Sequence, residues 1–161
     1  MKSEPHARAE ALRLWQEATT LHLERRIEEA MTLYRRSIEI CPTAEAHTFL
    51  GWAMSFQGDI EGAIRECRRA IEVDPEFGNP YNDIGAYLIE QGKLDEAIPW
   101  LERAKTAKRY EPRHFPYLNL GRLYASRGEV TRAISELEQA LEINPTDPTA
   151  NRALAKLRAL N

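Results

Sequence analysis

Long apolar runs are missing from this sequence of 161 residues. No stretch approaches the roughly 20 apolar residues that a membrane-spanning helix needs, so no membrane partner is expected. The first ten residues contain no apolar segment of the kind found in a secretory signal, so no leader is visible. The two cysteines, Cys41 and Cys67, belong to no Cys-x-x-Cys pair or Cys/His cluster. We expect both to be reduced thiols that act as small hydrophobic residues, which is typical of a cytoplasmic protein.

Motifs that carry catalysis are missing as well. The sequence contains no glycine-rich phosphate loop, no nucleophile motif and no paired catalytic carboxylates. The four histidines are scattered, without a second ligand at helical spacing: His6, His22, His47 and His114. We therefore predict no enzymatic activity, no bound metal and no cofactor.

Neither sign of charge is in large excess. The formal net charge is −3, which gives no general attraction to nucleic acid. Hydrophobic residues make up 43% of the chain and charged residues 29%, a balance that indicates a folded protein and argues against disorder. The length corresponds to one domain.

Glycine and alanine, in contrast, recur at a fixed rhythm. Gly51, Gly85 and Gly121 are separated by 34 and then 36 residues. Three further columns keep the same two spacings: Gly58, Gly92 and Gly128; Ala63, Ala97 and Ala133; Ala70, Ala104 and Ala140. The two extra residues must lie in the stretch 105–114. An earlier and less regular copy contains Ala18, Ala30, Ser37 and Pro42, about 33 residues before the corresponding positions of the next copy. Such a period indicates a repeat protein.

The pattern resembles the tetratricopeptide repeat family. The resemblance rests on Leu50-Gly51…Ala63…Ala70…Pro75, on Ile84-Gly85…Ala97…Ala104, and on Leu120-Gly121…Ala133…Ala140…Pro145. It implies an all-α fold, a right-handed α-α superhelix with four helical hairpins over about 11–43, 44–77, 78–113 and 114–147, and a capping helix at 148–160. The whole chain, 1–161, would then be a single domain. Two departures stand out, since Arg109 replaces the closing proline of the third copy and Arg25 replaces a glycine in the first.

The repeated columns have physical reasons. Gly51 and its equivalents lie where the two helices of a hairpin cross, so only a small residue lets the backbones approach. Gly58 and its equivalents end the first helix in a left-handed conformation, which glycine adopts at least cost. Pro80 and Pro116 fall in the first turn of a helix, and Asp147 precedes Pro148 as a helix N-cap.

In this family the first helix of each repeat lines the concave surface, and that resemblance implies a binding groove. The expected groove positions contain large apolar residues that the fold has no need to bury: Trp15, Trp52, Phe56, Ile89, Phe115 and Leu118. Arg122 and Arg152 are expected toward the far end of the groove, and Glu45 and Glu90 toward its middle. Exposed aromatic side chains act as anchors for partners. We therefore predict a protein–protein interaction module that holds an apolar-rich peptide or helix, suited to a partner with an additional acidic segment.

Three alternatives stay open. Neighbouring helices could cover Trp15, Trp52 and Phe56, which would give them a structural role. The chain could be a self-assembling scaffold, with Trp100 on the outer side as a contact between copies. RNA binding through the paired arginines Arg35, Arg36, Arg68 and Arg69 is disfavoured, because these residues are typical of a solvated helix face with ion pairs. The carboxylate clamp of chaperone-binding members is not expected, since Thr48 and Trp52 stand where the clamp has lysine and asparagine.

Overall fold

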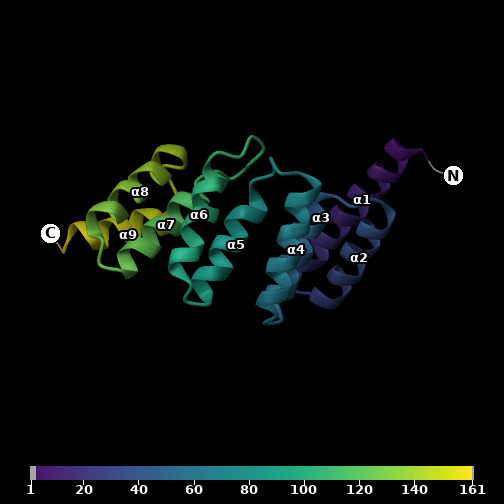
Figure 1. Cartoon of the computed structure of the whole chain (residues 1–161), viewed down its shortest axis with the longest axis horizontal. Helices are drawn as coiled ribbons and strands as arrows, with labels where there is room; N and C mark the ends of the chain where they lie inside the picture. Colours follow the sequence, from purple (N-terminus) through teal and green to yellow (C-terminus); the bar gives the residue numbers. More distant parts are fainter. Residues whose placement is uncertain (1–2, 161) are drawn as a thin grey trace.

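A computed structural model describes residues 3–160, and it consists of a row of helical hairpins (Figure 1). The helices are α1 (Glu4–Leu23), α2 (Ile27–Ile40), α3 (Ala44–Phe56), α4 (Ile60–Val73), α5 (Asn79–Glu90), α6 (Leu94–Lys105), α7 (Phe115–Ser126), α8 (Val130–Ile143) and α9 (Pro148–Arg158). The predicted all-α superhelix of four hairpins and a closing helix is confirmed. The first helix begins at Glu4, so the first hairpin starts earlier than the expected repeat boundary at residue 11.

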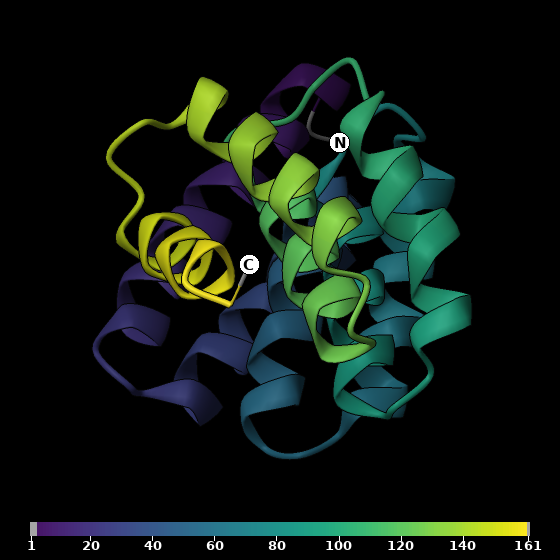
Figure 2. The same cartoon turned by 90° about the vertical axis from the view of Figure 1, so that its left-hand side faces the viewer.

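In the stack of hairpins, the first helices of successive hairpins lie closer together than the second helices do. Each hairpin packs on the next through its second helix, as in the pairs α2–α3, α4–α5, α6–α7 and α8–α9. The first helices also touch one another along the row, in the pairs α1–α3, α3–α5, α5–α7 and α7–α9. Among the described residues, the second helices make no such contacts with each other. The row therefore curves toward the side of the odd-numbered helices, which forms the inner face (Figure 2).

The small-residue columns permit the close crossing inside each hairpin. A β-carbon added to Gly51 would lie 2.8 Å from the carbonyl oxygen of Ala63, and one added to Gly121 would lie 2.7 Å from Cγ of Leu137. Ala63 and Leu137 are fully buried. The sequence-based expectation that only a minimal side chain fits at this crossing is confirmed.

The turns inside the hairpins use left-handed backbone conformations. Gly58, Gly92 and Gly128 have φ values of 82°, 77° and 75°. In the first hairpin the same turn contains Arg25, with φ of 66°. The turn geometry is thus retained where glycine is replaced, at a conformational cost of about 1 kcal/mol that the surrounding hairpin must offset.

The hydrophobic core is continuous along the row but divides into two main parts. One part joins α4 to α9, with fully buried Ile84, Leu101 and Leu120 among its members. The other joins α1, α2 and α3 around Ala18, Ala30 and Tyr34. Met54 packs against both parts and connects them.

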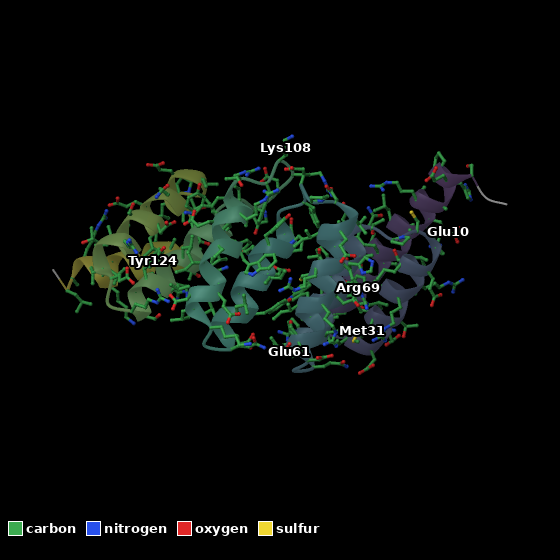
Figure 3. The ribbon with its side chains drawn as sticks, viewed as in Figure 1. Glu10, Met31, Glu61, Arg69, Lys108 and Tyr124 are labelled. Carbon is green, nitrogen blue, oxygen red and sulfur yellow. The ribbon has the colours of Figure 1, made fainter. Side chains whose placement is uncertain are left out.

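The stretch that contains the two extra residues forms the loop 106–114 between α6 and α7. Arg109 N donates to the carbonyl of Glu76 at 2.9 Å, and Gly78 N donates to the carbonyl of Arg109 at 3.0 Å. These bonds join the loop to the segment between α4 and α5, and the two connections rise side by side in Figure 1. Lys108 marks the tip of this loop in Figure 3. The insertion is thus an ordered part of the molecule and is placed beside the inner face.

Over residues 3–160 no helix combines the length and the apolar character required to cross a membrane.

Candidate functional site

The inner face contains a partly open hollow of about 220 Å³ between α3, α5, α7 and the loop 106–114. We call it the inner hollow. Its walls consist of Thr48, Phe49, Trp52, Asn79, Asn82, Asp83, Tyr110, Pro112 and Phe115. Four of these nine residues are aromatic, and the others are polar except for the proline. An apolar pocket with a few converging polar groups is the usual form of a binding site.

A second hollow adjoins the first and shares Phe49, Asn79 and Tyr110 with it. We call it the adjoining hollow. Its remaining walls are Leu12, Trp15, Glu45, Phe77, Arg109 and Glu111. Because three residues belong to both walls, the two hollows lie side by side on the inner face; together they extend from α1 to α7, and we call the pair the depression.

Arg109 fixes the inserted loop over this depression. Its guanidinium donates from Nη2 to Oδ2 of Asp74 at 2.8 Å and from Nη1 to Oε1 of Glu45 at 2.9 Å. The same group lies 4.4 Å from the centre of the Phe77 ring, within the range of a cation–π contact. Hydrogen bonding from Arg109 also lowers the pKa of Asp74. The residue that replaces the closing proline therefore binds the loop to α3 and to the end of α4.

Tyr110 forms the wall between the two hollows. Its side chain is buried and packs in a cluster with Tyr81, Ala104 and Ala107. Gly78 lies directly beneath its ring, since a β-carbon there would lie 2.6 Å from Cβ and Cγ of Tyr110. The small residue before α5 is therefore what allows the tyrosine to enter.

Aromatic rings continue from the inner hollow toward the end of α3. Trp52 lies over the buried His22 ring, with 3.8 Å between the ring centres, and makes edge contacts with Phe49 and Phe56. Burial, with Arg25 nearby, lowers the pKa of His22, so the imidazole beneath Trp52 is neutral at pH 7. Phe56 remains 48% exposed. Trp52 thus packs on His22 and also lines the inner hollow.

Two buried polar atoms in the walls have no hydrogen-bond partner. They are Oδ1 of Asn79, which is an acceptor, and Nε1 of Trp15, which is a donor. Neighbouring polar groups are satisfied, because Asn82 Oδ1 accepts from Asn119 Nδ2 at 2.9 Å and Thr48 Oγ1 donates to the carbonyl of Ala44 at 2.7 Å. Buried polar atoms of folded proteins are nearly always paired, so these two are candidates for contact with a ligand.

Asp83 is the acidic group of the inner hollow. It is half-buried on α5, and burial raises the pKa of its carboxyl to about 7, with partial compensation by a hydrogen bond from Asn82. Within residues 3–160 no basic group contributes to the pKa of Asp83, and the titratable groups whose pKa values it raises are Cys67, Tyr87 and Tyr110. A carboxylate in such surroundings lacks a counter-charge.

The predicted groove residues fall into three groups. Trp15, Trp52 and Phe115 line the depression, and Phe56 lies exposed beside it. Arg122 and Arg152 line a separate shallow hollow between α7 and α9, which we call the terminal hollow and which also contains Lys156. Ile89 is half-buried against the main core.

One of the predicted groove residues has to be corrected. Leu118 is only 5% exposed and packs in the main core with the other apolar residues of α7. The helix rotates this position toward its neighbours and not toward the groove, so Leu118 offers no surface to a partner.

Several wall residues were not predicted from the repeat columns: Phe49, Asp83, Tyr110 and Pro112. Phe49 and Asp83 lie one position away from predicted columns, where a small rotation of the helix decides which side chain faces inward. Tyr110 and Pro112 belong to the insertion. The two-residue excess was the available signal, because an insertion in a repeat array maps to a loop on one face, often the binding face.

Three outer-face residues considered above for other functions make contacts within the chain: Arg68, Arg69 and Trp100. The Arg68 guanidinium lies 5.1 Å from the ring centre of Trp100, which is half-buried and also contacts Tyr81. Arg69 donates to Glu66 at 2.5 Å, and the opposite oxygen of Glu66 lies 2.7 Å from Nδ1 of His47. His47 is buried, and this contact gives it a structural role.

Comparison with known proteins supports the repeat assignment. Two family models described as tetratricopeptide repeat match residues 44–77 and 77–146. Together they span 103 residues (44–146) of the 161, which is more than half of the chain.

Relatives and solved structures extend the likeness over nearly the whole chain. The type IV pilus assembly protein PilF of Pseudomonas aeruginosa is 29% identical over 133 residues, which cover 81% of this chain and 52% of that protein. A solved structure of Pseudomonas aeruginosa PilF has a TM-score of 0.88, with 26% identity over 95% of this chain and 70% of that one. YrrB, described as a protein with an unusual peptide-binding site, has a TM-score of 0.67 at 20% identity, over 93% of this chain and 77% of that one. The chain thus spans about half the length of the pilus assembly relative.

Proposed function

The chain belongs to the tetratricopeptide repeat family, whose members are generally protein–protein interaction modules, and on this premise we propose that it holds an apolar-rich peptide or helix of another protein on its inner face. The anchors of the partner would lie in the inner hollow and on the exposed rings beside it. Trp52, Phe56 and Phe115 are the residues proposed to contact them.

The observation that carries this proposal is the exposure of aromatic rings at and beside the inner hollow. Phe56 and Phe115 are 48% and 40% exposed, although both belong to helices whose other faces are buried. Large apolar side chains that remain in water at a concave site are typical of binding hot spots. The unpaired Trp15 Nε1 and Asn79 Oδ1 could pair with the peptide groups of an extended segment.

The far end of the inner face favours a partner segment of negative charge. Arg122, Arg152 and Lys156 line the terminal hollow, and both arginines are exposed. A partner that enters the inner hollow and continues toward α9 would meet these cations. We therefore propose that an acidic segment of the same partner lies over the terminal hollow, where it contributes to specificity and association rate more than to affinity.

The relatives agree with a role in holding other proteins. The printed description of YrrB includes a peptide-binding site, and PilF is described as an assembly protein. Both share the repeat fold with this chain. For this chain, a protein partner is part of the proposal, and so is any role in pilus assembly.

A peptide library tests the proposal directly. Short random peptides displayed on phage are selected against the chain, and their affinities are then measured for the wild type and for Trp52→Ala/Phe56→Ala. We expect the double variant to weaken binding by at least about tenfold while its helicity is retained. Val73→Ala/Ile143→Ala, which removes two exposed apolar side chains from the even-numbered helices, is the matched control. Equal affinities of wild type and groove variant would overturn the proposal.

Self-assembly and RNA binding are two further hypotheses for the function. Self-assembly is tested by light scattering across a range of concentrations, where a monomer throughout would exclude it. RNA binding through the outer arginines requires a steep salt dependence of affinity, because phosphate contacts release counterions. The structure uses Arg68 and Arg69 in internal contacts, which is a reason to place RNA binding last.

A further inference from the structure

We propose that the inner hollow binds a cationic side chain, a lysine or an arginine of the partner peptide, between its aromatic rings and the carboxylate of Asp83. This inference rests on the proposed function, because it names the residue type that would occupy the inner hollow. It adds a positive anchor to a partner so far described only as apolar with an acidic segment.

The charge distribution in the walls of the inner hollow favours a cation. Among the described residues that line the inner hollow, Asp83 has the only formal charge, and that charge is negative. The nearest basic group of the adjoining hollow is Arg109, and its guanidinium is already held by Asp74 and Glu45. His22, behind Trp52, is kept neutral by burial, which lowers its pKa. A half-buried carboxylate without a basic partner favours a cation.

The hydrogen-bonding groups point the same way. Asn79 Oδ1 is an unpaired buried acceptor, and the Asp83 carboxylate is an acceptor as well. The side-chain amide of Asn82 donates to Asp83, and the remaining acceptor positions would suit a ligand with several N–H groups. An ammonium offers three and a guanidinium five, and neither has an acceptor that would need a partner in turn.

The rings supply the remaining walls. Phe49, Trp52, Tyr110 and Phe115 surround the same space as Asp83. Aromatic faces are negative and attract cations within about 6 Å of the ring centre, and the attraction is strongest for tryptophan and for desolvated sites. The aliphatic stem of lysine or arginine would pack on the rings while its charged end reaches the carboxylate.

The size of the hollow fits one side chain. Its volume of about 220 Å³ is below the roughly 300–1,000 Å³ of pockets that hold drug-sized molecules, and it is too small for a helix. The rest of the partner must therefore lie outside, over the adjoining hollow and the exposed rings of Phe56 and Phe115. A single cation inserted from an otherwise apolar segment agrees with this arrangement.

The raised pKa of Asp83 supports the inference. Burial brings the pKa of this carboxyl to about 7, so a protein without ligand retains a group that costs stability when ionised. Perturbed acids of this kind concentrate at functional sites. A bound cation would supply the missing counter-charge and favour the ionised form.

A double-mutant cycle tests the inference. The peptides selected as above are resynthesised with norleucine for lysine, or citrulline for arginine, at each cationic position. The affinities of the charged and neutral peptides are then measured at pH 8 for the wild type and for Asp83→Asn. Glu96→Gln removes the same charge from an exposed position on α6, outside the proposed groove, and is the matched control.

We expect one cationic position whose neutral replacement weakens binding to the wild type by at least about tenfold and leaves binding to Asp83→Asn almost unchanged. Glu96→Gln should keep the full preference for the charged peptide. Equal losses in the wild type and in Asp83→Asn, or selected peptides without a lysine or arginine, would overturn the cation pocket.

These results are distinct from a failure of the proposed function. If the peptides depend on Trp52 and Phe56 but show no coupling to Asp83, the groove stands and only the cation pocket is wrong. If no selected peptide depends on Trp52 and Phe56, both proposals are contradicted.

Discussion

Tyr110 occupies the space that a side chain at Gly78 would need: a β-carbon there would lie 2.6 Å from the Cβ and Cγ of the tyrosine. The contact joins the segment before α5 to the loop 106–114. It places a residue of this longer loop in the wall of both hollows on the inner face. The shape of the groove therefore depends on the connection that contains the two extra residues.

The first prediction concerns Gly78→Ala. The added methyl group should displace Tyr110, lower the free energy of unfolding by about 1–3 kcal/mol and weaken peptide binding. Gly92→Ala is the control, since Gly92 has φ of 77° with open space around it. That variant should cost about 1 kcal/mol through the left-handed backbone alone and leave binding unchanged. Denaturant unfolding and peptide titration measure the two effects, and equal affinities of the two variants would refute the role of Tyr110.

The second prediction concerns the attachment of the loop by Arg109. Arg109→Met should lower the free energy of unfolding by about 1 kcal/mol, because the contacts with Asp74 and Glu45 are partly exposed. The loss should shrink in 1 M salt, where exposed charges are screened. Urea unfolding at low and high salt measures it. A loss that is the same at both salt concentrations would assign the effect to packing on Phe77 and not to the ion pairs.

The third prediction concerns the acid in the inner hollow. The pKa of Asp83 is raised by burial to about 7, so the stability it contributes is full below the pKa of the unfolded chain, near 4, and is lost as the pH rises toward 7. Asp83→Asn removes this penalty. The variant should be more stable than the wild type by about 1–3 kcal/mol at pH 8 and nearly equal to it at pH 4.

Urea unfolding at both pH values provides the test of Asp83. The other titratable groups that face it are Cys67 on α4, Tyr87 on α5 and Tyr110 in the loop, and burial raises the pKa of each, so they stay neutral across this range. A difference between wild type and variant that does not change with pH would contradict the assignment.

The fourth prediction concerns the contact between His47 and Glu66. Burial opposes ionisation of Glu66, but hydrogen bonds from His47 and Arg69 together lower the pKa of the carboxyl. A lowered pKa means that the stability is present above the pKa of the unfolded chain and is lost as the pH falls below it. His47→Phe should therefore cost about 2–3 kcal/mol at pH 7 and much less at pH 3.

The control for this prediction replaces Glu66 together with His47. The double variant His47→Phe/Glu66→Leu should recover most of the loss at pH 7, because it also removes the buried acid that has lost the hydrogen bond from His47. Thermal or urea unfolding of the three proteins gives the comparison. A double variant that is no more stable than His47→Phe would show that packing, and not the charge, sets the cost.

The repeat columns predicted most of the fold because each column corresponds to one local geometric requirement. Gly51 and Gly121 are needed at helix crossings, and Gly58 at a left-handed turn, so their spacing alone placed the hairpins. Arg25 shows that the turn survives without glycine, which is why the first hairpin was the least regular in the sequence. The closing helix followed from Asp147, whose carboxylate accepts from Ala150 N at 2.7 Å.

The site was less predictable because it depends on contacts between distant segments. Leu118 stands in a groove column by its position in the repeat, yet the packing of α7 turns it into the core. Asp83 and Phe49 reach the hollow from neighbouring positions. The role of Arg109 could not be read from its own repeat, since its partners Asp74 and Glu45 lie 35 and 64 residues earlier in the chain.

The most direct test of the account is an NMR titration of the labelled chain with a peptide selected from the library. We expect the largest shifts at residues 48–52, 79–83 and 110–115, with a change at the indole N–H of Trp52 and at the side-chain amide of Asn79. Shifts confined to the even-numbered helices, around Trp100 or Arg68, would contradict binding on the inner face.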